Sequence, residues 1–233
     1  MLTLPIQTVI AATPRASILR LDLGIQPFPY KAGQAAYLQL EGEPKRRPYS
    51  IASAPEQTAV TGLLEFLVQS EGDGHSGLAK DSLQPGRKVH VEGPLGSFQF
   101  PAHPSERHFL FIAGGTGVAP LHSMLWHALL AERDGRITFI YSVRSPEEFA
   151  YLKEFEGLDV AGKIDFHHTV TRGASEGWPG RQGRIDAAYL KPLISPGDTL
   201  CFLCGPPALV GEIPTLLEGL GVRREQILME QWT

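Results

Sequence analysis

Residues 108–120 have the sequence HFLFIAGGTGVAP, an apolar run that ends in a glycine-rich turn. A helical pattern, VAPLHSMLWHALLAERDG at residues 118–135, begins in the same turn. A buried strand, a glycine-rich turn and a helix in this order bring backbone N–H groups to the positive end of the helix, where a phosphate can bind. The turn does not match the common G-x-G-x-x-G dinucleotide fingerprint, and many such turns are only tight connections. Gly114, Gly115 and Gly117 are therefore candidate phosphate contacts that need support from the rest of the chain.

Segments of strand type and helix type alternate around this turn and onward to the C-terminus. Apolar runs of strand length lie at residues 108–115, 136–143, 163–170, 199–205 and 227–232, and helical patterns separate them at residues 118–135, 146–157, 186–194 and 207–221. Near-continuous apolar strands joined by helices are typical of a parallel sheet covered on both faces, with right-handed crossovers. The sequence therefore predicts a five-stranded parallel, doubly wound α/β domain over residues 103–233.

The first hundred residues have a different pattern. Six short β-rich runs, several of them separated by Gly, Pro or Asp, lie at residues 4–10, 17–23, 35–42, 47–53, 63–69 and 88–96. Six such strands predict a closed antiparallel barrel, with one short helix at residues 75–83. The segment PAHPSER at residues 101–107 has no apolar periodicity and marks the boundary. The barrel domain is thus predicted over residues 1–102.

Composition and charge exclude several classes of protein. The 233 residues carry a formal net charge of −4 and are 42% hydrophobic, which argues against disorder and against a broad basic surface for nucleic acid. The first residues lack the pattern of a secretion signal, so a cytoplasmic location is expected. The two cysteines, Cys201 and Cys204, are three apart in a predicted strand and point to opposite faces. With no cluster of further ligands nearby, we expect no metal site.

A second chemical motif lies in the barrel half. Arg47, Pro48, Tyr49 and Ser50 put a guanidinium, an aromatic ring and a hydroxyl on one strand. Arg47 could hold a pyrophosphate, Tyr49 could stack on a flat ring, and Ser50 could hydrogen-bond a ring nitrogen. Pro48 removes a donor from the ladder, so the strand should lie at an edge or bend. Taken alone, such a strand is more often a simple alternation of surface and core residues.

Four motifs in order make the pattern specific: R-x-Y-S at residues 47–50, G-G-T-G-x-A-P at residues 114–120, C-G-P-P at residues 204–207 and E-Q-W at residues 230–232. Together they resemble the ferredoxin-NADP reductase superfamily. The resemblance covers nearly the whole chain. It implies a two-domain core, with a flavin-binding barrel, a nucleotide-binding α/β domain, a reaction site in the cleft between them, and no fused ferredoxin or haem domain.

In the flavin half, the resemblance implies FAD in preference to FMN. Arg47 matches the residue that holds the flavin phosphates, Tyr49 the ring that stacks on the isoalloxazine, and Ser50 the hydroxyl near flavin N5. The neighbouring residues of the same segment are further candidate contacts: Pro48, Ile51 and Ser53. A second phosphate motif is similar to residues 74–78, with the candidates Gly74, Ser76 and Gly77. For Ser76, a solvated helix N-cap is nearly as good an interpretation.

In the nucleotide half, the resemblance implies that Gly114, Gly115, Thr116 and Gly117 face the pyrophosphate of NAD(P)H. Cys204 matches a cysteine beside the nicotinamide C4 atom. The residues expected to shape or complete that site are Gly205, Pro206, Glu230 and Trp232. Glu230 matches a carboxylate near the point of hydride transfer, and Trp232 an aromatic that covers the flavin. The chain departs from one branch of the family here, because Trp replaces a terminal Tyr and Thr233 follows it.

The choice between NADPH and NADH depends on a few basic residues. Thr171, Arg172 and Arg184 are similar to residues that hold the adenosine 2′-phosphate in NADPH-using relatives, and Arg144 is a weaker candidate. An NADH site would more naturally show an acidic residue on the ribose. The pattern favours NADPH, although a solvated Thr-Arg pair at a strand end explains it equally well.

The function implied by the resemblance is hydride transfer from NAD(P)H to bound FAD, with electrons passed to a ferredoxin or flavodoxin. Basic residues of the barrel half are candidates for docking that acidic partner: Lys31, Lys45, Arg46, Lys80, Arg87 and Lys88. Two alternatives stay open, a reductase of free flavin or of an oxygenase component, and a non-catalytic electron-relay subunit. The sequence does not identify the acceptor, the direction of electron flow or the oligomeric state.

Overall fold

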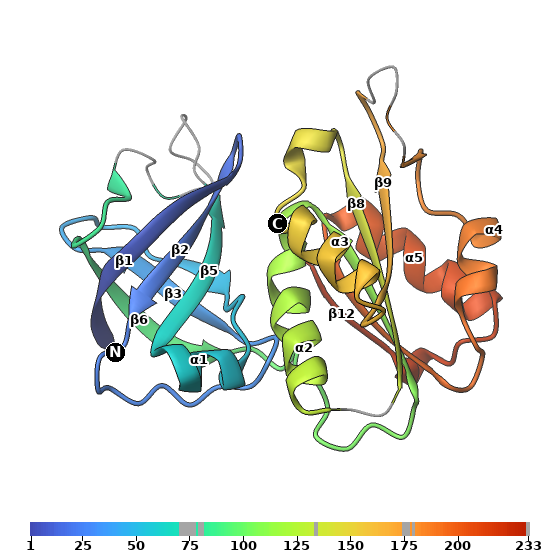
Figure 1. Ribbon diagram of the computed structural model, residues 1–233, viewed down its shortest axis with the longest axis horizontal. Coiled ribbons are helices and arrows are strands. Elements are labelled where there is room, and N and C mark those ends of the chain that lie inside the picture. Colours follow the sequence, from blue (N-terminus) through green and yellow to red (C-terminus); the bar gives the residue numbers. More distant parts are fainter. Residues whose placement is uncertain (70–77, 79–81, 133–134, 174–177, 179, 232–233) are drawn as a thin grey trace. The chain divides into compact units, whose positions relative to one another are not determined.

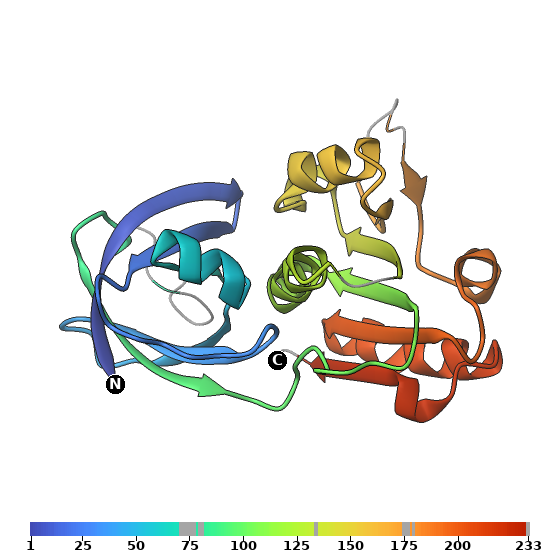
Figure 2. The same cartoon turned by 60° about the horizontal axis from the view of Figure 1, so that its bottom comes forward.

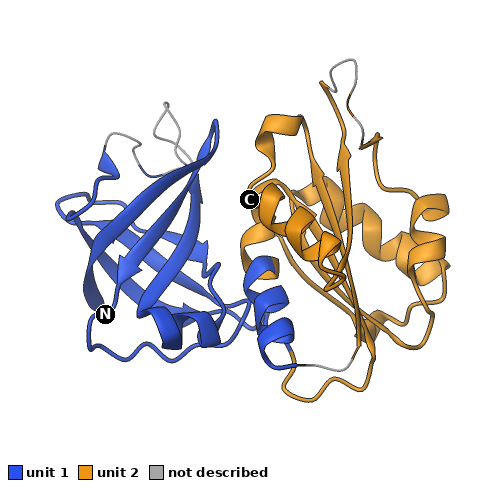
Figure 3. Cartoon of the chain, in the orientation of Figure 1, with its two compact units in different colours: residues 1–100, 122–132 blue, residues 101–121, 133–233 orange. Residues whose placement is uncertain are grey.

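The computed structural model of the chain describes residues 1–69, 78, 82–132, 135–173, 178 and 180–231. Contacts divide the chain into two compact units, residues 1–100 with 122–132, and residues 101–121 with 133–233 (Figure 3). The division falls inside one helix, α2 (Val118–Leu130), because its later turns group with the first unit. A single domain boundary at residues 102/103 remains a proposal.

The first unit contains the predicted six-stranded antiparallel barrel (Figure 1). Its strands are β1 (Leu2–Thr13), β2 (Ala16–Asp22), β3 (Ala35–Leu40), β4 (Arg47–Ser50), β5 (Leu63–Gln69) and β6 (Lys88–Leu95), in the order β4-β3-β6-β1-β2-β5. The two end strands meet where Ile51 bridges Phe66 and where the Ala52 N–H donates to the Glu65 carbonyl at 2.7 Å. Pro48 lies in end strand β4, where its missing N–H costs no central ladder bond.

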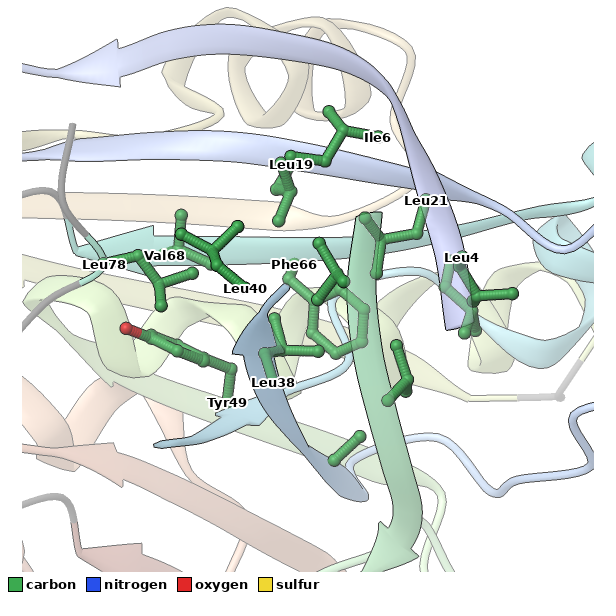
Figure 4. Packing of buried hydrophobic residues seen from close by; sticks show 14 of the residues in the cluster. Leu4, Ile6, Leu19, Leu21, Leu38, Leu40, Tyr49, Phe66, Val68 and Leu78 are labelled. Atoms are coloured by element: carbon green, nitrogen blue, oxygen red, sulfur yellow. The ribbon is translucent and has the colours of Figure 1, made fainter. Parts of the chain in front are cut away.

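The interior of the barrel is filled by the apolar residues that alternate along its strands. Leu19 and Leu21 of β2, Leu38 of β3 and Phe66 of β5 are almost completely buried in one cluster (Figure 4). Tyr49 belongs to the same cluster, and Figure 4 shows its hydroxyl pointing away from Phe66. The motif strand β4 is therefore attached to the core of the barrel through Tyr49.

One helix of the first unit was not expected from the sequence. Helix α1 (Pro55–Thr61) lies between β4 and β5, begins with Pro55 at its first position and ends at Gly62, which has a φ of 71°. Proline at the start and glycine just past the end are a known pair of helix boundary signals. The helix predicted at residues 75–83 falls largely outside the described residues.

The second unit contains a parallel sheet with six strands, where the sequence predicted five. The strands are β7 (His108–Gly114), β8 (Arg136–Val143), β9 (Asp165–Val170), β10 (Arg181–Gln182), β11 (Thr199–Gly205) and β12 (Ile227–Gln231), in the order β10-β9-β8-β7-β11-β12. The additional strand is β10, which pairs in parallel with Thr169 and Val170 of β9. It was missed because a polar strand of only two residues leaves no periodic signal.

Helices cover both faces of this sheet (Figure 2). They are α3 (Leu152–Val160), α4 (Ala187–Leu190) and α5 (Pro207–Gly219), and short 3₁₀ turns lie at η2 (Gly115–Gly117), η3 (Pro146–Glu148), η4 (Lys191–Leu193) and η5 (Arg224–Gln226). In the part of the chain that the structure describes, no helix is long and apolar enough to cross a membrane.

The two faces of the sheet are packed differently. One face is aromatic, with Phe111 stacked between Phe139 and Phe202 and with Phe155 of α3 stacked on Phe139. The other face is aliphatic, and its cluster joins strand residues to residues of α4 and α5: Leu110, Ile112, Ile140, Leu190, Leu203, Ile213 and Leu217. Burial of both faces explains why the strands are near-continuous apolar runs in the sequence.

Candidate functional site

The R-x-Y-S strand includes a buried serine hydroxyl that the described residues leave unsatisfied. Ser50 is 4% exposed, and its Oγ atom has no hydrogen-bond partner among the described residues. A buried hydroxyl without a partner costs about 1–3 kcal/mol, so a missing partner is expected at this place. Arg47, at the start of the same strand, is half-buried, whereas Pro48 is exposed. A flavin ring nitrogen near Ser50 and a phosphate near Arg47 fit this arrangement.

The backbone that follows β4 is fixed by side chains from two other segments. His122 Nδ1 of α2 donates to the Ala52 carbonyl at 2.8 Å, and Ser123 Oγ donates to the Ser53 carbonyl at 2.7 Å. The Tyr30 hydroxyl donates to the same Ser53 carbonyl at 2.9 Å, and burial raises the pKa of Tyr30 to about 12. These three donors hold the segment next to Ser50 in one conformation.

The hydroxyl of Ser53, as well as its carbonyl, takes part in hydrogen bonds within the protein. Its hydroxyl accepts the Glu65 N–H at 3.1 Å and the Thr58 hydroxyl at 3.0 Å. Ile51 is completely buried and bridges to Phe66. The structure thus gives both residues a part in closing the barrel, and their contact with flavin stays a prediction. Gly74, Ser76 and Gly77 of the second phosphate motif lie outside the described residues, as do Trp232 and Thr233.

The glycine-rich turn of the second unit lies directly against the turn that follows β11. A Cβ atom on Gly117 would lie 2.5 Å from the Cys204 carbonyl oxygen, and one on Gly114 would lie 2.7 Å from Pro206 Cδ. A Cβ atom on Gly205 would in turn lie 3.0 Å from the Gly114 Cα atom. These three positions have no room for a side chain, because the two turns are in direct contact. The structure therefore brings together the G-G-T-G and C-G-P-P motifs, which are about 90 residues apart in the sequence.

Gly115 has a different environment from its neighbours in the turn. Its φ of +54° is left-handed, and a Cβ atom added to it would meet nothing within 4 Å. Gly115 and Thr116 are both half-exposed, at the place where α2 begins. The first N–H groups of a helix have no partner inside the helix and favour an anion. The open side of the turn fits the pyrophosphate of a dinucleotide.

Cys204 and Glu230 lie side by side on neighbouring strands. The parallel register of β11 and β12 pairs them directly. Cys204 is completely buried, and Glu230 is half-buried with an Oε2 atom that has no hydrogen-bond partner in the described part of the chain. Burial raises the pKa of Glu230 to about 7. A carboxyl group that titrates near neutral pH can hold or release a proton under physiological conditions.

The ends of β8 and β9 place two arginines next to each other. The Arg172 N–H donates to the Arg144 carbonyl at 2.8 Å, and Thr171 Oγ1 donates to the Val143 carbonyl at 3.2 Å. Neither guanidinium group forms an ion pair with a described residue. These two arginines can therefore bind an anion without first breaking an ion pair with a carboxylate of the described residues.

Arg184 differs from that pair, because its guanidinium is engaged. It donates to both carboxylate oxygens of Glu212, in α5, at 2.8 and 3.1 Å. Both side chains are largely exposed, and such surface pairs contribute only about 0–1 kcal/mol. Binding a phosphate at Arg184 would require this weak pair to open.

Two family models cover most of the chain. The oxidoreductase FAD-binding domain matches residues 2–100, and the oxidoreductase NAD-binding domain matches residues 111–213. A Na(+)-translocating NADH-quinone reductase component of a Marinomonas species is 31% identical over 202 residues, which are 80% of this chain and 48% of that protein. The reductase component of the glycine betaine monooxygenase of Pseudomonas aeruginosa is 32% identical over 203 residues, 83% of this chain and 54% of its own length. The chain thus spans about half the length of these relatives.

Solved structures show the same fold. A cytochrome P450 reductase of Amycolatopsis superposes with a TM-score of 0.86 at 25% identity, covering 98% of this chain and 68% of that one. A ferredoxin NADP+ reductase of Neisseria gonorrhoeae with bound FAD and NADP gives a TM-score of 0.81 at 23% identity, covering 99% and 98%. The predicted flavin and pyridine nucleotide cofactors are confirmed by the two family models.

Proposed function

This chain belongs to the ferredoxin-NADP reductase superfamily, and we propose that it transfers a hydride from NAD(P)H to bound FAD and passes the electrons to a protein acceptor. The observation that carries the proposal is the unsatisfied Ser50 hydroxyl on the R-x-Y-S strand of the FAD-binding half. The glycine-packed turn of the NAD-binding half supports it.

Each residue of the flavin strand has a separate task in this proposal. Arg47 binds a phosphate, and the ring of Tyr49 supports the isoalloxazine. The Ser50 hydroxyl lies near flavin N5 and donates to a nitrogen of the flavin ring. The His122, Ser123 and Tyr30 hydrogen bonds orient the backbone beyond Ser50, which fixes the position of its hydroxyl. Gly74, Ser76 and Gly77 remain proposed phosphate contacts.

The nucleotide half orients the second cofactor. Gly114, Gly115, Thr116 and Gly117 receive the pyrophosphate, while Cys204 borders the nicotinamide. A bound flavin accepts hydride from a nicotinamide ring held against it, and that chemistry belongs to the cofactors. The protein supplies orientation, a turn shaped by Gly205 and Pro206, and the Glu230 carboxyl, which holds a proton on one oxygen at pH values below about 7. Trp232 remains a proposed cover of the flavin.

NADPH is the proposed donor. Arg144 and Arg172 lie together at the strand ends without ion-pair partners among the described residues, which suits a dianionic 2′-phosphate. Thr171 borders them, and Arg184 contributes only after leaving Glu212. The Arg172→Ala variant should therefore lose more of the NADPH preference than Arg184→Ala. KM values for NADPH and NADH in both variants test this order, and an unchanged NADPH/NADH ratio in Arg172→Ala would contradict it.

The acceptor is proposed to be a small electron carrier such as a ferredoxin or flavodoxin. The predicted basic docking surface is partly neutralised, because Arg46 pairs with Glu92 and Arg87 pairs with Glu43. Lys31 remains an exposed cation of that surface. Because this surface has less free charge, a second candidate function is the reduction of an oxygenase component. One relative of the chain is the reductase component of the glycine betaine monooxygenase. To separate the candidates, turnover is measured with one electron acceptor at a time: a ferredoxin, a flavodoxin or an oxygenase component. An artificial dye serves as the reference acceptor.

The central experiment is the visible spectrum of the purified protein before and after addition of NADPH or NADH under anaerobic conditions. A flavin spectrum that is bleached by the nucleotide is expected. Arg47→Ala should lose flavin during gel filtration, whereas Arg136→Ala, an exposed arginine paired with Asp165, should retain it. A colourless protein that does not take up added FAD would refute the proposal. The cytoplasmic location and the absence of a nucleic acid partner remain proposals as well.

A further inference from the structure

Tyr141 connects two segments at the edge of the nucleotide turn. It lies in β8 in register with Ala113 of β7 and is completely buried. Its hydroxyl donates to the Gly115 carbonyl at 3.0 Å and accepts the Ala150 N–H at 3.3 Å. A buried phenol in an apolar strand needs such partners. Burial also raises the pKa of Tyr141, so the hydroxyl keeps its proton and remains a donor.

The bond from Tyr141 determines more than the position of one oxygen atom. The carbonyl of Gly115 and the N–H of Thr116 belong to the same planar trans peptide group and point in opposite directions. When the carbonyl is held, the direction of the Thr116 N–H is held as well. The Gly115 carbonyl also accepts the Val118 N–H, so both of its lone pairs are used.

Gly115 is the position of the turn that most needs such a contact. Gly114 and Gly117 are confined by the backbone and side-chain atoms of residues 204–206, whereas open space surrounds the Cβ position of Gly115. A glycine with open space around its Cβ position has a wide choice of backbone angles unless a hydrogen bond restrains it, and a ligand would otherwise have to restrict that choice when it binds. A turn that is already ordered spares the ligand this entropic cost.

We propose that Tyr141 is a positioning residue for the nucleotide phosphates: its hydroxyl fixes the Gly115–Thr116 peptide group so that the Thr116 N–H is aimed at the pyrophosphate. The second hydrogen bond, from Ala150, ties the segment between β8 and α3 to the same hydroxyl. The inference rests on the proposed function, because it takes the turn to be the site of a dinucleotide.

The Tyr141→Phe variant tests the proposal because it keeps the ring and removes only the hydroxyl. The affinities for NADPH and for ADP-ribose, which carries the same pyrophosphate, should fall about tenfold. Turnover at saturating NADPH should change by less than about twofold, because the contact serves binding rather than a step of the reaction. FAD content should equal that of the parent. Tyr189→Phe, a half-buried tyrosine in α4, is the matched control and should change none of these values.

Amide hydrogen exchange of the nucleotide-free protein separates this inference from the proposed function. Peptides covering residues 113–118 should exchange faster in Tyr141→Phe than in the parent. If the parent binds neither NADPH nor ADP-ribose, the proposed function fails, and faster exchange still supports the role of Tyr141 in ordering the turn. Equal nucleotide affinity in both proteins overturns the inference, and so does unchanged exchange in this turn.

Discussion

Replacing Glu230 with Gln should stabilise the protein at pH 8 and leave its stability at pH 4.5 nearly unchanged. Glu230 lies in β12, is half-buried, and has one carboxylate oxygen that is buried without a hydrogen-bond partner among the described residues. Burial raises the pKa of Glu230 from 4.5 to about 7. The folded protein therefore favours the protonated carboxyl group, which Gln imitates in shape and charge.

The sign and size of this stability change follow from the linkage between proton binding and folding. Between pH 4.5 and 7 the folded state binds a proton at Glu230 that the unfolded state has lost, so the contribution of Glu230 to stability falls as the pH rises through this window. Each pKa unit corresponds to about 1.4 kcal/mol, which gives an upper limit of about 3 kcal/mol above pH 7. Because Glu230 is only half-buried, screening by water reduces the expected loss to about 1–2 kcal/mol. Gln at this position carries no charge and avoids the loss.

Equilibrium urea unfolding of the FAD-loaded protein at pH 4.5, 6 and 8 measures the effect. The free energy of unfolding of Glu230→Gln should exceed that of the parent by about 1–2 kcal/mol at pH 8, with a smaller difference at pH 6. Glu225→Gln is the control, because Glu225 is an exposed residue in a surface pair with Arg223. A difference that does not depend on pH would show that Glu230 ionises in its ordinary range, and the reasoning from its burial would be wrong.

Three further changes have defined outcomes. Ser50→Ala should stabilise the flavin-free protein by about 1–3 kcal/mol, because it removes a buried hydroxyl without a described partner, but it should weaken FAD retention in gel filtration. Gly117→Ala should cost about 1–3 kcal/mol in thermal unfolding and reduce NADPH binding, because the new Cβ would lie 2.5 Å from the Cys204 carbonyl oxygen. Gly157→Ala, with open space around it, is its control. Burial lowers the pKa of His108 to about 4, so the contribution of His108 to the parent's stability should fall by up to about 3 kcal/mol as the pH falls from 6.5 to 4. The difference in unfolding free energy between the parent and His108→Gln, measured by urea unfolding, should therefore decrease as the pH falls from 6.5 to 4. A difference that does not change with pH would contradict this.

The sequence predicted the elements of the fold where each had a strong local signal. The six barrel strands and the five longer parallel strands are confirmed because apolar periodicity reports which face is buried. Strand β10 lacks such a signal, because its two polar residues have no apolar periodicity. They pair with β9 only because the fold brings them beside it. Helix α1 did carry a boundary signal, Pro55 and Gly62, but its short length hid it between two strands.

The motifs of the candidate site are visible in the sequence, whereas the contacts that support them are not. Arg47 to Ser50 and Gly114 to Gly117 are visible in the sequence because they are contiguous. The bonds from Ser123 to Ser53 and from Tyr141 to Gly115 join residues 70 and 26 positions apart, and no local pattern reports them. The pairing of Arg184 with Glu212 is hidden for the same reason, and it changes which arginines are available to a phosphate. A tyrosine inside an apolar strand was the one available hint, because its hydroxyl must find a partner.

The two halves differ in what they lack without their cofactors. In the barrel, the Ser50 hydroxyl is buried and unsatisfied among the described residues, so flavin binding would relieve a cost that the folded protein already bears. In the nucleotide turn, Gly115 and Thr116 are half-exposed and the Gly115 carbonyl is fully bonded, so water can serve the remaining groups when no nucleotide is present. Relief of a buried deficit strengthens binding, and stronger binding is mostly expressed as slower dissociation. A ligand that only replaces water at an ordered surface gains less. This asymmetry would suit a reductase that keeps its flavin through many turnovers and releases NAD(P)+ after each one.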